Sequence, residues 1–369
     1  MNEDKANRYH RLRRRVSVSG AGLVAGWLVL LLISGLSVSL RDAAAAAASG
    51  SFVLTVIYYS LVVAMLTEAV KLPVAYYQGL ILERRYGLSA QTVPEWGLDR
   101  ARTGSVVVVL AAMGALMVCS LLRWSPVYWW LVASMCFVTV LVFLVRIGPV
   151  LLFPTFYRLK PVQRTELCLR IAYLAERTGA GELGVFECQF GHQARQANAM
   201  LAGIGRTRRV LLSDTLLADY SDDEVEVMLA HEIAHHVHHD IWKAIGLAAV
   251  LIVFGFYLTD LALDVGVGHF GLLDVGYIAG LPLLVLVGGA VSLVLMPLAN
   301  ALSRAHELRA DKYALEITGN SEAFMSAIKR LAAQNLAEER PSRLVEILFY
   351  SHPPVAARLE AARAWSSGR

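Results

Sequence analysis

Long apolar runs separated by polar segments are the main feature of this 369-residue chain. A transmembrane helix needs about 20 apolar residues. Six runs of that length occur, at about 20–40, 52–82, 104–122, 126–153, 243–262 and 271–299. The composition agrees, with 56% hydrophobic and 17% charged residues, because a soluble domain rarely carries so few charges. We therefore expect a mainly α-helical, multi-pass integral membrane protein with about six transmembrane helices.

The positions of the basic residues predict how the chain is oriented. Arginine and lysine gather in the first 15 residues, in 83–103, in 155–243 and after 303, and the other connections hold few. By the positive-inside rule, both termini and both large polar segments face the cytoplasm. The predicted organisation begins with a basic N-terminus (1–19) and four spans with a cytoplasmic loop at 83–103 (20–153). A cytoplasmic segment (154–242), two more spans (243–299) and cytoplasmic C-terminal helices (300–369) follow.

Charge and cysteine usage exclude two other classes of protein. The basic residues flank membrane spans, where anionic lipid accounts for them, so we expect a lipid bilayer around the chain and no nucleic-acid partner. The cysteines have no C-x-x-C spacing and are expected to be free thiols rather than a disulfide framework. They are Cys119, Cys136, Cys168 and Cys188.

The stretch His-Glu-Ile-Ala-His at 231 to 235 is the strongest chemical signal in the cytoplasmic part. Residues four apart lie on one face of a helix, so His231 and His235 can bind one metal ion. Glu232 then lies beside the open coordination position, where a carboxylate can accept the proton of an attacking water. Ser221 followed by Glu224 predicts the start of the helix that carries the motif. The alternative is a histidine-rich polar helix face, since His236, His238 and His239 follow at once.

A small sheet is expected just before this helix. Gly181 to Gln189 reads as a strand, and Ala197 to Ala202 with Arg208 to Leu212 reads as a hairpin, because glycine residues lie between the two runs. An exposed edge strand beside a metal site can hold an extended peptide by adding it as another strand. The sheet therefore fits a peptide substrate.

A catalytic zinc site needs three protein ligands and an open fourth position. The candidates for the third ligand are Asp240, His306, Glu307, Asp311 and His352. A glutamate on a later helix, with an aspartate one turn further on, is the gluzincin arrangement. We therefore assign the third ligand to Glu307, with Asp311 accepting the other ring N–H of a ligand histidine. If His306 were the ligand instead, Glu307 and Asp311 would form an exposed charged face.

Two charges lie within the second apolar run. Glu68 and Lys71 are three residues apart and can pair on one helix face. Intramembrane charges usually face a bundle interior or a water-filled cavity. The sequence leaves two interpretations open: the pair lines a polar chamber, or it is a structural ion pair.

The His231 to His235 motif, the Glu307 to Asp311 pair and several stretches around them resemble those of the type I CAAX prenyl proteases, integral-membrane zinc metallopeptidases that trim prenylated proteins. The resemblance implies a cytoplasmic gluzincin-like α+β domain whose active site opens into a chamber enclosed by the transmembrane helices. One span fewer is found here than in eukaryotic members, and arginine and alanine usage suggests a bacterial inner (cytoplasmic) membrane. The matching stretches cover about four fifths of the chain, in family order: Ile81 to Leu88 with Gln91-Thr92, Asn198-Ala199, Arg209 to Leu217, His231 to His235, Glu307 to Asp311, and Tyr350 to Pro354 with Arg358.

The resemblance also implies roles for residues outside the motif helix. Asn198, with Ala199 beside it, would lie on the edge strand and hydrogen-bond the substrate backbone. His352 would stabilise the oxyanion of the tetrahedral intermediate. Arg358 would buttress the site or contact the substrate. The function implied is a zinc metalloendopeptidase with one Zn²⁺ per chain and a peptide or protein substrate, membrane-associated or lipidated chains included.

Two other functions stay open from the sequence. One is a membrane quality-control metalloprotease resembling the heat-shock membrane proteases, although those typically have fewer spans. The other is a non-catalytic membrane chamber or transporter with a structural zinc. A structural zinc site would be closed by four protein ligands, and no fourth candidate stands out in the sequence.

Overall fold

The computed structural model describes residues 3–151, 158–179, 181, 183–189, 199–202, 209–269 and 278–368. Within these residues six helices are long and apolar enough to cross a membrane, as the sequence predicts. The membrane part consists of α1 (Glu3–Ile33), α2 (Leu36–Ala47), α3 (Phe52–Tyr76), α4 (Glu83–Tyr86), α5 (Val93–Trp124), α6 (Trp129–Leu151), α11 (Asp240–His269) and α12 (Leu281–Thr318).

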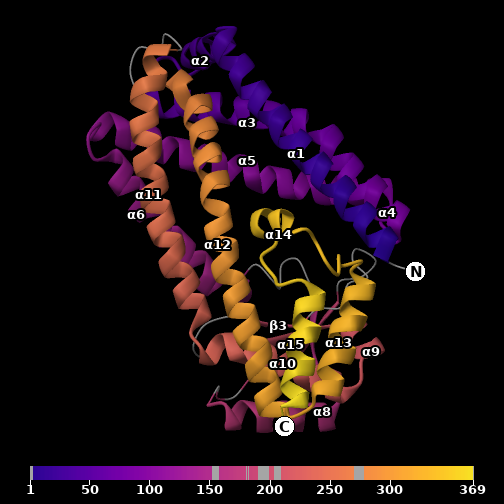
Figure 1. Cartoon of the computed structure of the whole chain (residues 1–369). Helices are drawn as coiled ribbons and strands as arrows, with labels where there is room; N and C mark the ends of the chain where they lie inside the picture. Colours follow the sequence, from indigo (N-terminus) through magenta and orange to yellow (C-terminus); the bar gives the residue numbers. More distant parts are fainter. Residues whose placement is uncertain are drawn as a thin grey trace.

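The long helices form two groups (Figure 1). α3 packs against both α1 and α5, and α11 packs against both α6 and α12 in the second group. α2 lies at the end of the molecule away from the two chain termini, and α12 runs from that end down into the C-terminal helices. A cavity of about 970 Å³ lies among α1, α3, α5 and α12. The four cysteines are free, as expected.

The first span differs from its predicted limits of 20–40. α1 ends at Ile33, and Gly35 then adopts a left-handed conformation with a φ of 71° before α2 begins. Glycine takes this conformation without steric cost. The helix therefore ends inside an apolar run that the hydropathy pattern shows as continuous. At its other end α1 extends back into the polar N-terminus, because Ala6 and Tyr9 are buried against Leu82, Tyr86 and Leu336.

The prediction of a polar loop at 83–103 is wrong, because most of this segment is helical. A π-helical turn (Tyr77–Leu82) joins α3 to α4, which stops at Gly87. α5 already begins at Val93, where Thr92 and Glu95 cap each other's backbone N–H groups. The Thr-x-x-Glu spacing and a proline in the first turn are recognisable start signals. The connection between the two helices is therefore only a few residues long.

The sixth span and the helix that follows it form one element. The sequence puts the end of the sixth span at 299 and a cytoplasmic helix after it, and the structure shows no break between them, because α12 continues through Pro297 to Thr318. Prolines are tolerated inside membrane helices where neighbouring groups compensate for the missing backbone bond. Gly319 ends α12 with a φ of 67°. Glu307 and Asp311 are therefore carried on a rigid extension of a membrane span.

The polar part of the chain forms a helical domain around a four-stranded sheet. The strand order is β1-β2-β4-β3, with β2 and β4 parallel and the other pairs antiparallel. β3 and β4 are the predicted hairpin strands, β2 is the predicted first strand, and β1 was not predicted. The elements are β1 (Arg158–Pro161), α8 (Thr165–Arg177), β2 (Gly184–Gln189), β3 (Ala199–Ala202), β4 (Arg209–Ser213), α9 (Asp214–Asp219), α10 (Asp222–Val237), α13 (Ser321–Gln334), α14 (Arg343–Phe349) and α15 (Val355–Ser367).

The main hydrophobic core lies where the sheet, α8 and the C-terminal helices meet α10. Leu229, Ala230 and Ile233 of α10 are fully buried, together with Val210 and Leu212 of β4. α10 packs against α12, α13, α8 and β3. Burial of a leucine or isoleucine side chain stabilises the folded state by roughly 1.5–3 kcal/mol. The metal-motif helix is therefore fixed from several sides by the packing of its apolar face.

Candidate active site

The helix that carries the His-Glu-x-x-His motif begins with a reciprocal cap. The side chain of Ser221 accepts a hydrogen bond from the backbone of Glu224, and the Glu224 carboxylate accepts one from the Ser221 backbone. Glu224 also accepts a hydrogen bond of 2.7 Å from Ser326 on α13. One carboxylate thus sets both the start of α10 and its contact with the C-terminal helices.

Three potential metal ligands converge between α10 and α12. Nε2 of His231 lies 3.4 Å from one carboxylate oxygen of Glu307, and Nε2 of His235 lies 3.4 Å from the other. One ligand atom from each of the three residues lies within 4.8 Å of the others. Two imidazole nitrogens and a carboxylate are a donor set of the kind that catalytic zinc uses. The described residues show no other group that meets the same distance criterion.

Each histidine has a carboxylate behind it. Nδ1 of His231 lies 2.9 Å from Asp311, as predicted for a group that orients the ring. Nδ1 of His235 lies 3.0 Å from Asp240, which also pairs with Arg309. Carboxylates in such positions fix the ring orientation and tautomer of metal-binding histidines. The sequence suggested Asp240 only as a third ligand, but the structure puts it against the far side of His235.

Charge and burial shift the pKa values of the histidines. Burial by itself lowers the pKa of His231, but its contacts with Asp311 and Glu307 outweigh burial and raise the pKa to about 9. Burial also opposes protonation of His235, whose pKa is nevertheless raised by Glu307 and Asp240. The negative charge around the rings is therefore suited to hold a cation.

Glu232 lies between the three potential ligands and the edge strand. Burial raises the pKa of its carboxyl group, His231 and His235 oppose the rise, and the neighbouring Glu307 adds to it. A backbone hydrogen bond from Leu201 of β3 also opposes the rise. A buried carboxylate whose pKa moves toward neutrality is a better proton acceptor and donor at working pH. The hydrogen bond to β3 also connects this group to the edge of the sheet.

A pocket of about 160 Å³ adjoins these groups. It contains His231, Glu232, Glu307, His352 and Arg358, and Ala199 of β3 lies at its wall. Nε2 of the exposed His352 lies 3.5 Å from Glu307. The rest of the wall is apolar and consists of Val227, Met228, Phe324, Ala327, Ile328 and Leu331. Asn198, predicted beside Ala199, lies outside the described residues.

Arg358 is placed behind the potential ligands. Its guanidinium donates to both carboxylate oxygens of Asp311, and its side chain is only 12% exposed. Arg358, Asp311 and His231 thus form a chain that ends at Nδ1 of the histidine ring. Of the two roles expected for Arg358, this geometry matches the buttress, and the guanidinium also borders the pocket.

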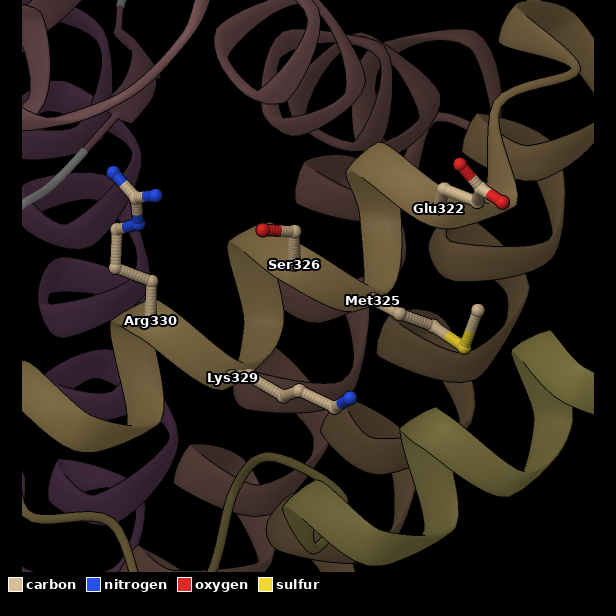
Figure 2. Close-up of a pocket in the computed structure, with 5 residues that line it drawn as sticks. All are labelled: Glu322, Met325, Ser326, Lys329 and Arg330. Carbon is tan, nitrogen blue, oxygen red and sulfur yellow. The ribbon is translucent and has the colours of Figure 1, made fainter.

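A second hollow lies on α13 and contains none of the predicted site residues (Figure 2). Arg330 in its wall stacks on the ring of Tyr220 at 5.2 Å and donates to the backbone of Asp219. Ser326 uses its hydroxyl for the bond to Glu224. These polar groups therefore serve the packing of α13 against α9 and α10. The lining residues are Glu322, Met325, Ser326, Lys329 and Arg330.

Comparison with known proteins places the chain in a family. Residues 161–366 match the model of peptidase family M48, and residues 2–158 match the CAAX prenyl protease N-terminal model, described as five membrane helices. The chain belongs to the CAAX prenyl protease family of M48 peptidases. Within residues 2–158 the structure has four candidate spans among the described residues.

Individual relatives of this M48 member cover most of its length. The uncharacterized metalloprotease YhfN of Bacillus subtilis (strain 168) is 31% identical over 349 residues, which is 92% of this chain and 81% of the relative. CAAX prenyl protease 1 of Saccharomyces cerevisiae is 28% identical over 321 residues, with 80% and 69% covered. The crystal structure of S. mikatae Ste24p shares the fold, with a TM-score of 0.83 at 23% identity over 98% of this chain and 88% of that one.

These relationships establish the class of activity. The chain is a membrane zinc metalloprotease similar to the CAAX prenyl proteases, and it acts on peptide or protein substrates. It is embedded in the membrane through several helices. The predicted fold class, family and reaction type are therefore confirmed.

One further acidic residue of this M48 member holds the segment that carries His352. Glu338, between α13 and α14, accepts a hydrogen bond of 2.6 Å from Arg14 of α1 and one of 2.7 Å from the Tyr350 hydroxyl. Arg304 of α12 donates to the Tyr350 carbonyl at 2.6 Å. The N-terminal helix is thereby connected to the chain two residues before His352.

Replacing Glu338 by glutamine is expected to lower the free energy of unfolding by about 2 kcal/mol, because both bonds are made to a buried charge. Thermal unfolding in detergent measures the change. Glu339→Gln is the matched control, since Glu339 is exposed. Equal unfolding temperatures for the two variants would contradict the assigned role.

Proposed function

We propose that His231, His235 and Glu307 hold one zinc ion per chain and that Glu232 is the general base of peptide hydrolysis. The observation that carries this proposal is the convergence of two Nε2 atoms on the two oxygens of Glu307, with Glu232 in the same pocket. The donor set fits zinc, because it combines imidazole and carboxylate and both rings are held from behind by Asp311 and Asp240. When bound there, zinc supplies Lewis-acid activation of water and of the scissile carbonyl.

The remaining steps belong to side chains of the pocket. Glu232 accepts the proton of the attacking water and returns it to the leaving amine. His352, at the exposed rim and 3.5 Å from Glu307, donates a hydrogen bond to the developing oxyanion. Arg358 and Asp311 keep the His231 ring in place and take no part in proton transfer.

The substrate is proposed to bind as an added strand. β3 is the edge of the sheet, Ala199 borders the pocket, and Leu201 lies against Glu232. An extended peptide along β3 would bring a carbonyl to the pocket, with Asn198 as a further hydrogen-bonding group. The apolar wall of the pocket suits an aliphatic substrate side chain next to the scissile bond.

Zinc uptake is expected to release protons. Because His231 has a raised pKa of about 9, the metal-free site is protonated at neutral pH, and ligation requires the neutral ring. Zinc affinity should therefore fall about tenfold for each pH unit below about 9, with about one proton released from this ring near pH 7.

Calorimetric titration with zinc in buffers of different ionisation enthalpy measures this release, and a small zinc chelator in the same buffers is the control. The proton release should diminish as the pH rises through 9, because the ring is then already neutral. An affinity that stays constant between pH 7 and pH 9 would show that His231 is not protonated in the metal-free site.

We also propose an orientation and a type of substrate. Basic residues gather around the protease segments and the N-terminus, so both termini and the active site face the cytoplasm of a bacterial inner membrane. The similarity to a relative named CAAX prenyl protease 1 and the membrane position of the fold favour a membrane-associated or lipidated chain within the bilayer. The two cytoplasmic segments 154–242 and 300–369 together complete the zinc site in this proposal.

Hydrolysis of matched peptides tests the proposal. Purified protein with zinc should cleave a C-terminal peptide with an aliphatic residue after the scissile bond, and a lipidated copy of the peptide should have a lower KM. Equal KM values for the two peptides would contradict the proposed preference for lipidated substrates, but the proposed peptidase activity would still stand. Preferential cleavage of misfolded membrane proteins would favour a quality-control protease instead.

A further inference from the structure

The cavity among α1, α3, α5 and α12 has a charged end. Its volume of about 970 Å³ lies at the upper limit of roughly 300–1,000 Å³ typical of ligand pockets. Most of the wall is aliphatic, and the charged residues that border it are Glu68, Lys71 and Arg100. Glu68 and Lys71 therefore form an ion pair and also line a cavity, but the wall of this cavity is mostly apolar rather than polar.

The charges at this end do not cancel. One oxygen of Glu68 accepts a hydrogen bond of 2.6 Å from Lys71, and the other accepts one from Arg100. Two cations thus share one carboxylate, which leaves a net charge of about +1, since an ammonium and a guanidinium are positive and one carboxylate is negative. The Lys71 side chain is 40% exposed and belongs to the lining of the cavity.

The neutral polar groups of the lining already have partners. Gln78 donates to Ser17 at 2.9 Å, Thr67 accepts from Trp27 at 3.2 Å, and Tyr59 shares a hydrogen bond of 2.6 Å with Ser37. An uncompensated cation beside an apolar wall is costly unless an anion meets it. The surplus positive charge is therefore the part of the cavity that a ligand can complete.

We propose that this cavity binds a single-chain amphiphile with an anionic carboxylate head. Lys71 and Arg100 hold the head, and the chain lies among the aliphatic side chains toward Leu281 and Val285. The volume suits one long chain rather than a two-chain phospholipid. Leu293 of α12 lines the cavity, and Glu307 lies further along the same helix. The helix between these two residues is roughly 20 Å long, so the bound molecule lies apart from the hydrolytic pocket.

Binding to the full-length protein in a neutral detergent tests the proposal. Native mass spectrometry should show one oleate per chain, with at least about tenfold weaker binding of oleyl alcohol, which has the same chain without the charge. Lys71→Met should weaken oleate binding about tenfold, and Lys71→Arg should restore it. Glu68→Gln should strengthen oleate binding, because it raises the positive charge of the site.

The controls separate a ligand site from a structural ion cluster. Arg102→Gln removes a charge from α5, the helix that carries Arg100, at a position outside the cavity lining. This variant should leave oleate binding unchanged. Ala111→Phe, which fills the aliphatic part, should weaken both ligands. Equal binding of oleate and oleyl alcohol would overturn the proposal, and so would a Glu68→Gln variant that binds oleate as weakly as Lys71→Met. Because the readout is binding, this outcome is independent of the proposed catalytic roles.

Discussion

Replacement of Glu232 by glutamine is expected to reduce the turnover of peptide hydrolysis by about 10³-fold, within the range of general acid–base catalysis. Glutamine keeps the shape of the side chain and its contact with β3, but it cannot accept the proton of the attacking water. The three proposed metal ligands are unchanged, so zinc content should stay at that of the wild type. Hydrolysis of a fluorogenic peptide and elemental analysis of the same sample measure the two quantities.

Glu226→Gln is the control for this variant. It makes the same substitution on the same helix, at a residue that pairs with Arg170 rather than with the pocket, and it should keep full activity. A Glu232→Gln enzyme with wild-type turnover would remove Glu232 from the mechanism. Loss of zinc together with activity would point to a structural role for this carboxylate.

Replacement of Asp311 by alanine is expected to be the most destabilising single change near the site. Asp311 is 2% exposed and receives both hydrogen bonds of the Arg358 fork. Without it a largely buried guanidinium loses its hydrogen-bonded carboxylate, which costs about 3–5 kcal/mol when one member of a buried pair is removed. The ring of His231 also loses its anchor, so zinc affinity should fall about 10–100-fold.

The double variant Asp311→Ala, Arg358→Leu separates these two effects. Removal of both charges should restore most of the free energy of unfolding, because no buried charge remains unpaired. Zinc affinity should stay low, since His231 is still unsupported. Thermal unfolding of the metal-free proteins and zinc titration give the two values. A double variant as unstable as Asp311→Ala, or one with wild-type zinc affinity, would contradict this account of the Arg358–Asp311–His231 chain.

Hydropathy and short motifs predicted the parts of this protein that local sequence determines. A run of about 20 apolar residues has few alternatives to a membrane helix, so the number of spans was correct. The cap at Ser221 and Glu224 and the i, i+4 spacing of His231 and His235 are likewise local. The choice of Glu307 depended on the gluzincin pattern, and the structure puts its carboxylate against both rings.

The features that the sequence did not predict depend on contacts between distant segments. Hydropathy does not show where a helix leaves the bilayer, so the predicted span limit at 299 does not correspond to any boundary in α12. The contact of Asp240 with His235 arises from the junction of α10 with α11, which no periodicity encodes. β1 is short and becomes a strand only by pairing with β2. The start of α5 is different, because the Thr92 and Glu95 cap is local and its Thr-x-x-Glu spacing is present in the sequence, although the polar residues of 83–103 favour a loop.

X-ray absorption at the zinc edge of the purified protein tests the central claim most directly. We expect one zinc per chain with nitrogen and oxygen ligands at about 2.0–2.1 Å, including two imidazoles, a carboxylate and one position open to water. Glu307→Gln should lose that signal. A sulfur ligand at about 2.3 Å, or a closed site of four protein ligands, would show that His231, His235 and Glu307 do not form a catalytic zinc centre.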